Sequence, residues 1–250
     1  KTLWKPYGYF GDYASWEEAQ KKAGGYDDAS IFQRVQEASA LVQQGKANFE
    51  RDGIAFLEKF EWKALEYFRQ AAGESKRLKV LDFGGALGSH YFPVKNALSD
   101  IDFDWTIVEQ AGFVEIGKKE FATEKLHFAD GLTEALKDSY DLVLFGCVLP
   151  YLEQPYEVLS LVCKAKIPFI LIDKHPLIGG NRDRITVQRI PPSIYEASYP
   201  AWFFSQAKFE SFMPPYQLVD SYWCDDIFNI NSRFKTYFYQ LKEKDGISSN

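Results

Sequence analysis

The sequence predicts an α/β protein: a mostly parallel sheet that ends in a C-terminal antiparallel hairpin, with a helical cap formed by the N-terminal part. Two observations support this prediction. From residue 78 to residue 173, short apolar segments alternate with helical or turn segments that are long enough to cross over and return as parallel strands. Residues 216–223 and 233–241 are apolar segments without a helical pattern between them, which favours an antiparallel pair.

The composition sets the organisation and excludes some classes of partner. With 250 residues, 46% apolar and 26% charged, we expect one main domain over residues 76–250, with an insert at about residues 176–205, and the cap over residues 1–75. The net charge of −6 and the lack of a basic stripe argue against nucleic acid as a partner. No apolar run reaches the roughly 18 residues of a membrane span. Three widely spaced cysteines predict a reducing, cytoplasmic location.

The first third of the chain predicts helices and loops without a core strand. Ser15 and Glu18 have the spacing of a capping box, which predicts that a short helix starts there. Apolar residues recur at helical spacing from residue 31 to residue 42, and Gly45 can end that helix. A second apolar stripe over residues 54–71 predicts another helix.

The parallel strands are predicted from apolar runs, each of which is followed by a polar or glycine-rich turn. The candidates are residues 78–83, 104–109, 125–130, 140–149 and 168–173. The carboxyl ends of these strands share one edge of the sheet, which is where doubly wound folds bind ligands.

The turn after the first of these strands has the composition of a ligand-binding loop. Glycines there let the backbone approach a ligand closely, while the carboxylate of Asp82 would repel a pyrophosphate and can attract a cationic group. A dinucleotide motif read from Gly84 would need glycines where the chain has Ala86 and Ser89, which disfavours a nicotinamide-dependent oxidoreductase. The residues expected to contact a cofactor here are Asp82, Gly84, Gly85, Ala86 and Gly88.

Acidic residues end the next two strands. Glu109 lies about 20 residues after the last glycine, where a carboxylate accepts hydrogen bonds from ribose hydroxyls. Asp130 ends the third strand at the same edge, and Phe145 and Gly146 at the end of the fourth are expected to flank the cofactor. Each acid taken singly is also explained as a solvated carboxylate at a strand end.

The turn reads D-x-G-x-A-x-G, which resembles the first motif of class I S-adenosylmethionine (SAM) methyltransferases, D/E-x-G-x-G-x-G, with Ala86 at the middle glycine. The resemblance implies a Rossmann-like sheet, SAM as cofactor and Asp130 toward the adenine amine. Longer stretches resemble a family of methyltransferases associated with bacterial surface-polysaccharide gene clusters. They are "YGYFGDYASWEEAQ", "GYDDASI", "FERDG", "LDFGGALGSHYF" and "ITVQRIPPSIYEASYPAWFFS". That likeness implies methyl transfer to a sugar or glycan precursor and brings no catalytic residue with it.

A hydroxyl acceptor needs a base near the ends of the fourth or fifth strand. His175 is the first candidate, because its ordinary pKa is near neutrality, and Asp173 is expected to orient it. His175 is equally well explained as a solvated loop histidine. His90, directly after the glycine turn, is the second candidate, and His127 is expected to be structural.

Four residues of the insert are expected to bind a polar small-molecule or glycan acceptor. Arg182 and Arg184 match phosphate or carboxylate groups, although surface ion pairs explain them equally well. Tyr195 and Tyr199 can stack on a sugar face, or merely pack a cap onto the sheet. No metal site is predicted. A SAM-binding protein without catalysis stays open as an alternative to a methyltransferase, and the identity of the acceptor is left open.

Overall fold

The computed structural model describes residues 7–26, 28–191, 194 and 197–243. Its main sheet has the strand order β12-β13-β9-β8-β5-β6-β7. The parallel strands are β5 (Arg77–Phe83), β6 (Asp102–Val108), β7 (Leu126–Ala129), β8 (Leu142–Gly146) and β9 (Phe169–Ile178). The antiparallel hairpin is β12 (Tyr216–Cys224) and β13 (Arg233–Leu241). The predicted parallel strands and the C-terminal hairpin are therefore confirmed, and β9 extends beyond its predicted end.

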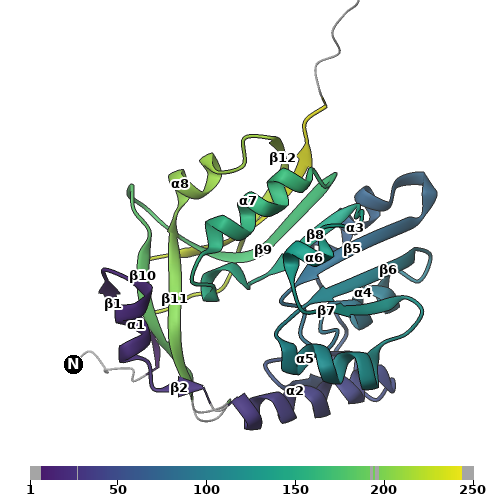
Figure 1. Ribbon diagram of the computed structural model, residues 1–250, viewed down its shortest axis with the longest axis horizontal. Coiled ribbons are helices and arrows are strands. Elements are labelled where there is room, and N and C mark those ends of the chain that lie inside the picture. The colour runs from purple at the N-terminus through teal and green to yellow at the C-terminus, as the bar shows by residue number, and fades with distance from the viewer. Residues whose placement is uncertain (1–6, 27, 192–193, 195–196, 244–250) are drawn as a thin grey trace, which may run out of the picture.

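Helices cover both faces of this sheet, which is why its strands read as continuous apolar runs. Along β5, Leu78 and Val80 face one helical layer, and Leu81 faces the other. The first layer consists of α2 (Asp28–Gln43), α3 (Leu65–Ala72), α4 (Tyr91–Ala97) and α5 (Ala111–Ile116). The second consists of α6 (Leu132–Ala135), α7 (Pro155–Ala165) and α8 (Gln206–Ser211). Figure 1 shows α6 and α7 in front of the strands and α4 behind them.

Short helical segments also occur along the chain, and they connect the larger elements. They are η1 (Gly73–Ser75), η2 (Gly117–Phe121) and η3 (Leu149–Tyr151). Within the described ranges, no helix combines the length and the apolar character that crossing a membrane would require.

The N-terminal part contains the expected helices together with unexpected strands. Ser15 caps α1 (Trp16–Lys22) by accepting the Glu18 N–H at 3.1 Å, which confirms the capping-box prediction. The apolar stripe of α2 is buried as expected. The predicted helix over residues 54–71 is wrong in its first half, because β3 (Phe49–Arg51) and β4 (Ile54–Phe56) form a hairpin there. Its turn is Asp52-Gly53, with positive φ angles of 53° and 73°.

An extension made of strands that pair with one another in antiparallel fashion begins at the carboxyl end of β9. It contains β1 (Gly8–Tyr13), β2 (Gly25–Tyr26), β10 (Arg184–Arg189) and β11 (Ala197–Ser205). The predicted insert supplies β10 and β11, while β1 pairs with β10, so the expectation of no core strand in the first third is wrong. Gly11 has a φ of +86° at the point where the β1–β10 register shifts, and a bulge of this kind favours glycine.

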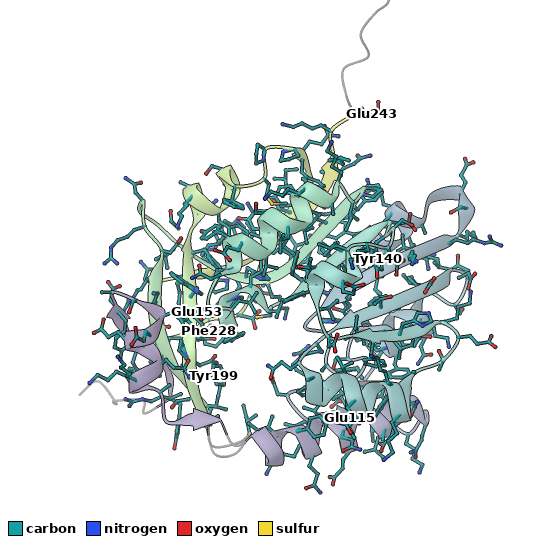
Figure 2. All side chains as sticks on the ribbon, viewed as in Figure 1. Glu115, Tyr140, Glu153, Tyr199, Phe228 and Glu243 are labelled. Atoms are coloured by element: carbon teal, nitrogen blue, oxygen red, sulfur yellow. The ribbon has the colours of Figure 1, made fainter. Side chains whose placement is uncertain are left out.

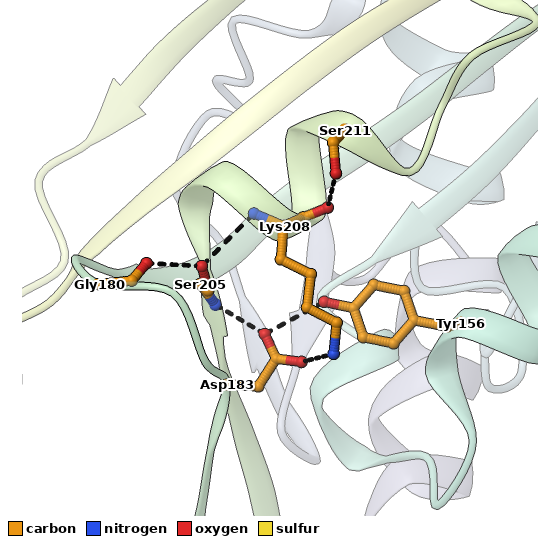
Figure 3. Close-up of polar contacts among 6 residues, drawn as sticks. All are labelled: Tyr156, Gly180, Asp183, Ser205, Lys208 and Ser211. Atoms are coloured by element: carbon orange, nitrogen blue, oxygen red, sulfur yellow. Dashed lines mark hydrogen bonds and ion pairs between the residues drawn. The ribbon is translucent and has the colours of Figure 1, made fainter.

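The junction between the extension and the main sheet contains the nearly buried carboxylate of Asp183, whose side chain is 4% exposed. Asp183 accepts hydrogen bonds from the Tyr156 hydroxyl at 3.1 Å and from the Ser205 N–H at 2.8 Å, and it forms an ion pair with Lys208 (Figure 3). The Ser205 hydroxyl donates to the Gly180 carbonyl at 2.8 Å. One carboxylate thus joins α7, β11, α8 and the loop after β9.

Candidate cofactor and acceptor site

The glycine turn folds around the carboxylate of Asp82, which is fully buried at the end of β5. Trp105 Nε1 donates to Asp82 Oδ2 at 3.2 Å, whereas Oδ1 has no hydrogen-bond partner in the described part of the chain. A Cβ at Gly85 would lie 2.4 Å from Asp82 Oδ2, so the position requires glycine. Ala86 has a φ of +48°, which explains why the related motif has glycine there. Ala86 therefore adopts the backbone conformation of the motif with some backbone strain.

Glu109 connects the turn to the end of β6. Its Oε1 accepts the Ala86 N–H at 3.3 Å and its Oε2 accepts the Gln110 N–H at 2.8 Å, which leaves each oxygen able to accept one more hydrogen bond. Burial raises the pKa of Glu109. The Glu109 N–H donates to the Ala129 carbonyl at 3.1 Å, so Asp130 lies next to it, exposed at the end of β7.

Phe145, at the end of β8, was expected to flank the cofactor, and its side chain points elsewhere. Its side chain is fully buried and packs against Phe83 on the layer of α6, α7 and α8, so only its backbone remains to flank the turn. Gly146 does lie at the site. A Cβ there would come within 2.2 Å of the His90 imidazole, which therefore rests directly on this strand end.

His175 is not placed to act as a base. Lys174, with a φ of +53°, lies in a bulge where the β9–β13 register shifts, and the imidazole that follows points into the core toward Phe204 and Phe209. Its Nε2 accepts the Leu149 N–H at 3.3 Å, and its Nδ1 lies 2.8 Å from the Asp173 carbonyl. Burial lowers the pKa of His175 to about 3. Both nitrogens are occupied, and the ring is inaccessible to an acceptor.

His90 lies at the sheet edge where such a base is needed. Its Nδ1 is 3.4 Å from Asp82 Oδ2, and its ring stacks on Trp62 with centroids 5.4 Å apart. Burial by itself would lower the pKa of His90, but the carboxylates of Asp82, Asp173 and Glu50 outweigh it and raise the pKa. The third histidine, His127, is exposed and lies 3.2 Å from Asp104, as expected of a residue outside the site.

The carboxylate of Asp173 does not orient His175, contrary to expectation. Its Oδ2 accepts the Trp62 Nε1–H at 3.2 Å, and its Oδ1 accepts the Thr236 hydroxyl at 2.6 Å. The contact of Asp173 with His175 is made by the backbone carbonyl instead.

The two arginines of the insert contact the neighbouring strand β1. Arg182 forms a bidentate ion pair with Asp12, and Arg184 donates two hydrogen bonds to the Gly11 carbonyl at 2.8 and 2.6 Å. Both therefore fix β1 to β10, and their role in acceptor binding stays a prediction. Tyr195 lies outside the described residues.

Tyrosine side chains line the part of the extension next to the end of β8. Figure 2 shows Tyr199 on β11, and its ring lies edge-on to that of Tyr151, with centroids 5.3 Å apart. The Tyr151 hydroxyl lies 3.3 Å from that of Tyr9. Cys147, with a φ of +55°, follows Gly146, and burial together with the nearby carboxylates of Asp173, Asp52 and Asp226 raises its pKa to about 12. Among the described residues, no group of His, Cys, Asp or Glu side chains can hold a metal ion.

Solved structures with the same strand arrangement settle the fold. The N-terminal domain of EvdMO1, crystallised in the presence of SAH (S-adenosylhomocysteine) and D-fucose, is 14% identical over 87% of this chain and 98% of that chain, with a TM-score of 0.51. Magnesium protoporphyrin IX methyltransferase (ChlM) from Synechocystis PCC 6803, with bound SAH, is 11% identical over 84% and 99%, with a TM-score of 0.52. The fold is that of a class I methyltransferase.

The glycopeptide N-methyltransferase MtfA, complexed with SAM, also has this class I methyltransferase fold: it is 11% identical over 71% of this chain and 92% of that chain, with a TM-score of 0.51. No family model and no curated protein matches the chain. The predicted class I methyltransferase fold is thus confirmed by structure, and the roles of individual residues rest on the geometry described above.

The sequence did not lead us to expect that part of the N-terminal segment contacts residues beside the glycine turn. Trp62 stacks on His90, and Glu50 accepts a hydrogen bond from Ser89. For Glu50 a signal was present, because Asp52-Gly53 is a strong hairpin signature that would have placed residue 50 on a strand. For Trp62 the sequence holds no such pattern.

Proposed function

We propose that the protein is a SAM-dependent methyltransferase. The observation that carries this proposal is the Glu109 carboxylate, which is tied to the Ala86 N–H and keeps two free acceptor positions beside the partly unpaired Asp82. A ribose diol matches the first group, and a cationic ligand matches the second. A dinucleotide matches less well, because its pyrophosphate would have to approach the buried carboxylate at the glycine turn.

Bound SAM would supply a methyl group already activated on a sulfonium, so the chain has to align the acceptor and, for a hydroxyl, remove its proton. We assign proton removal to His90 in place of His175. Nδ1 of His90 faces Asp82, which leaves Nε2 as the nitrogen that accepts a proton. The carboxylate of Asp82 then stabilises the imidazolium that forms.

The acceptor that we propose is a saccharide or a related polar molecule without phosphate groups, methylated on oxygen. The hydroxyls of Tyr9 and Tyr151 can exchange hydrogen bonds with a polyol. Arg182 and Arg184 are already engaged by β1, and near Cys147 the carboxylates of Asp173, Asp52 and Asp226 outnumber the one cation, Lys174, which pairs with Asp226, so a neutral acceptor fits better than a phosphorylated one. The EvdMO1 domain, which was crystallised in the presence of D-fucose, supports a sugar. An origin of the acceptor in a bacterial surface polysaccharide rests on the sequence resemblance.

A cytoplasmic location is part of the proposal. The three cysteines, Cys147, Cys163 and Cys224, are free thiols. Unpaired cysteines are the usual state in a reducing compartment.

The purified protein should bind SAM and SAH, and not NAD. Calorimetry with each ligand measures this directly. With methyl-labelled SAM, neutral glycans and glycosides should be labelled in preference to nucleotide sugars. Binding of NAD alone would refute the proposal, whereas SAM binding without transfer to any acceptor offered would support a SAM-binding protein that lacks catalysis.

Glu109→Ala should weaken SAM binding at least tenfold, because each charge-assisted hydrogen bond to a ribose hydroxyl contributes roughly 1.5–3 kcal/mol. The raised pKa of Glu109 sets the direction of the pH effect: affinity of the unmutated protein should fall as the pH drops through that pKa, since the protonated carboxyl loses its charge. Calorimetry at several pH values measures both effects. Asp130→Ala is a milder control, since Asp130 is exposed. Equal SAM affinity of the Glu109 variant and the unmutated protein would show that Glu109 does not bind the ribose.

A further inference from the structure

The imidazole of His90 is held by a residue from outside the glycine turn. Trp62 lies in the segment between β4 and α3, and its indole plane makes an angle of 26° with the His90 ring. The imidazole also rests against Gly146, and its Nδ1 faces Asp82. The ring is therefore held by contacts with an indole and a strand end, called the clamp below, and Asp82 defines which nitrogen points inward.

The indole that forms this clamp is itself fixed. Trp62 Nε1 donates to Asp173 Oδ2 at 3.2 Å, and the opposite oxygen of Asp173 accepts from Thr236 at 2.6 Å and from the Tyr222 hydroxyl at 3.4 Å. Asp173 is 5% exposed and Thr236 is fully buried. The position of Trp62 is thereby set by β9, β12 and β13, three strands of the main sheet.

The same N-terminal segment also contacts the residue before His90. Ser89 donates a hydrogen bond to Glu50 Oε2, and the other carboxylate oxygen of Glu50 accepts the Gly53 N–H at 2.8 Å. Glu50 is only 7% exposed. Two neighbouring residues at the start of α4 are thus held by the β3–β4 hairpin and by the segment that follows it.

We propose that Trp62 is a positioning residue for His90: its indole, held by Asp173, keeps the imidazole in the one orientation in which Nε2 is available to the acceptor. This inference rests on the proposed function, in which His90 removes the proton. The acidic groups that face His90 are Asp82 from β5, Asp173 from β9 and Glu50 from β3. An aromatic face stabilises an imidazolium in addition to these charges, so the clamp influences both the orientation and the proton affinity of the ring.

The proposal can be tested without an acceptor, because the chain has only three histidines. Each should give a resolved imidazole signal in ¹⁵N–¹H NMR spectra of the labelled protein, and titration follows their protonation. In Trp62→Leu the pKa of His90 should shift by at least about half a unit and its imidazole signal should broaden or double, because the aromatic face, part of the burial and the hydrogen bond that fixes Asp173 are lost together. His127 and His175 serve as internal references: His127 pairs with Asp104 on β6, and His175 packs against Phe204 and Phe209, where burial should keep it neutral throughout.

Two further variants make the result specific. Trp62→Phe keeps an aromatic face but loses the N–H that Asp173 accepts, so the His90 titration should move in the same direction by a smaller amount, which keeps the test usable if Trp62→Leu fails to fold. Trp202→Leu removes another indole, whose Nε1 donates to the Leu152 carbonyl at 2.9 Å in the extension, and should leave His90 unchanged. An unmoved His90 titration in a folded Trp62→Leu protein would overturn the proposal, as would an equal shift in Trp202→Leu.

The outcome separates this inference from the proposed function. If the His90 titration shifts in Trp62→Leu but the unmutated protein does not bind SAM, Trp62 does position His90 and the methyltransferase proposal fails. If SAM binds and His90 does not shift, the proposed function stands and the clamp is refuted. With an acceptor in hand, the rate in Trp62→Phe should be lower at constant SAM affinity, and its pH profile should move in the direction of the NMR titration.

Discussion

Replacing His90 by alanine is expected to lower the rate of methyl transfer by about 10²- to 10⁴-fold, the contribution of a well-placed general base. SAM affinity should change little, because the proposed ribose contact is made by Glu109, at the end of another strand. Transfer of a labelled methyl group under single-turnover conditions measures the rate, and calorimetry measures the affinity.

The pH dependence gives this prediction a direction. Only neutral imidazole accepts a proton, and the neighbouring carboxylates raise the pKa of His90. A larger fraction of His90 is therefore protonated at neutral pH than for a solvated histidine, and the rate should rise as the pH increases through that raised pKa. His127→Ala is the matched control, since His127 is exposed and pairs with Asp104, away from the glycine turn. A loss below tenfold in His90→Ala, with an unmoved pH profile, would remove His90 from the mechanism.

Asp183→Ala should reduce the free energy of unfolding by about 3 kcal/mol. The substitution leaves the Ser205 N–H and the Tyr156 hydroxyl without their acceptor, and each hydrogen bond to a charged group contributes roughly 1.5–3 kcal/mol. It also removes the ion pair with Lys208, but that lysine is about half exposed and the pair contributes little. Urea unfolding followed by fluorescence measures the change.

Two variants test whether the position of the carboxylate is responsible. Asp183→Asn keeps an acceptor of the same shape and should lose less stability than the alanine variant. Asp12→Ala removes the exposed ion pair with Arg182 in the same extension and should cost less than about 1 kcal/mol. If Asp183→Ala is no more destabilising than Asp12→Ala, the junction in Figure 3 does not hold the extension in place.

The parallel strands and the glycine turn are predictable because their sequence signals are local. Strands buried on both faces read as short apolar runs, and β5, β6 and β8 follow that rule. Positive φ angles of 78° at Gly84 and 106° at Gly88 require glycine or a strained substitute, which the sequence displays directly. The end of β6 then places Glu109 by strand geometry alone.

The remaining features depend on contacts between distant parts of the chain. β1 carries two glycines in six residues, which normally argues against a strand, and only its pairing with β10 makes it one. The partner of Arg182 is Asp12, far away in the sequence. A bulge at Lys174 turns His175 to the opposite face of the sheet, and no residue pattern predicts a bulge at that position.

The pairing of β1 with β10 has a consequence for the order in which the molecule is assembled. β1 is synthesised well before β10, but Gly8, Tyr9 and Phe10 pair with residues 187–189 of that strand. Contacts so distant along the chain are entropically costly to close and form slowly. During synthesis, Tyr9 can therefore pair with β10 only after β10 has left the ribosome, long after β5, β6 and the glycine turn have been synthesised. In the proposed function, the residues that would contact SAM are therefore synthesised before the strand pair that carries Tyr9 can form.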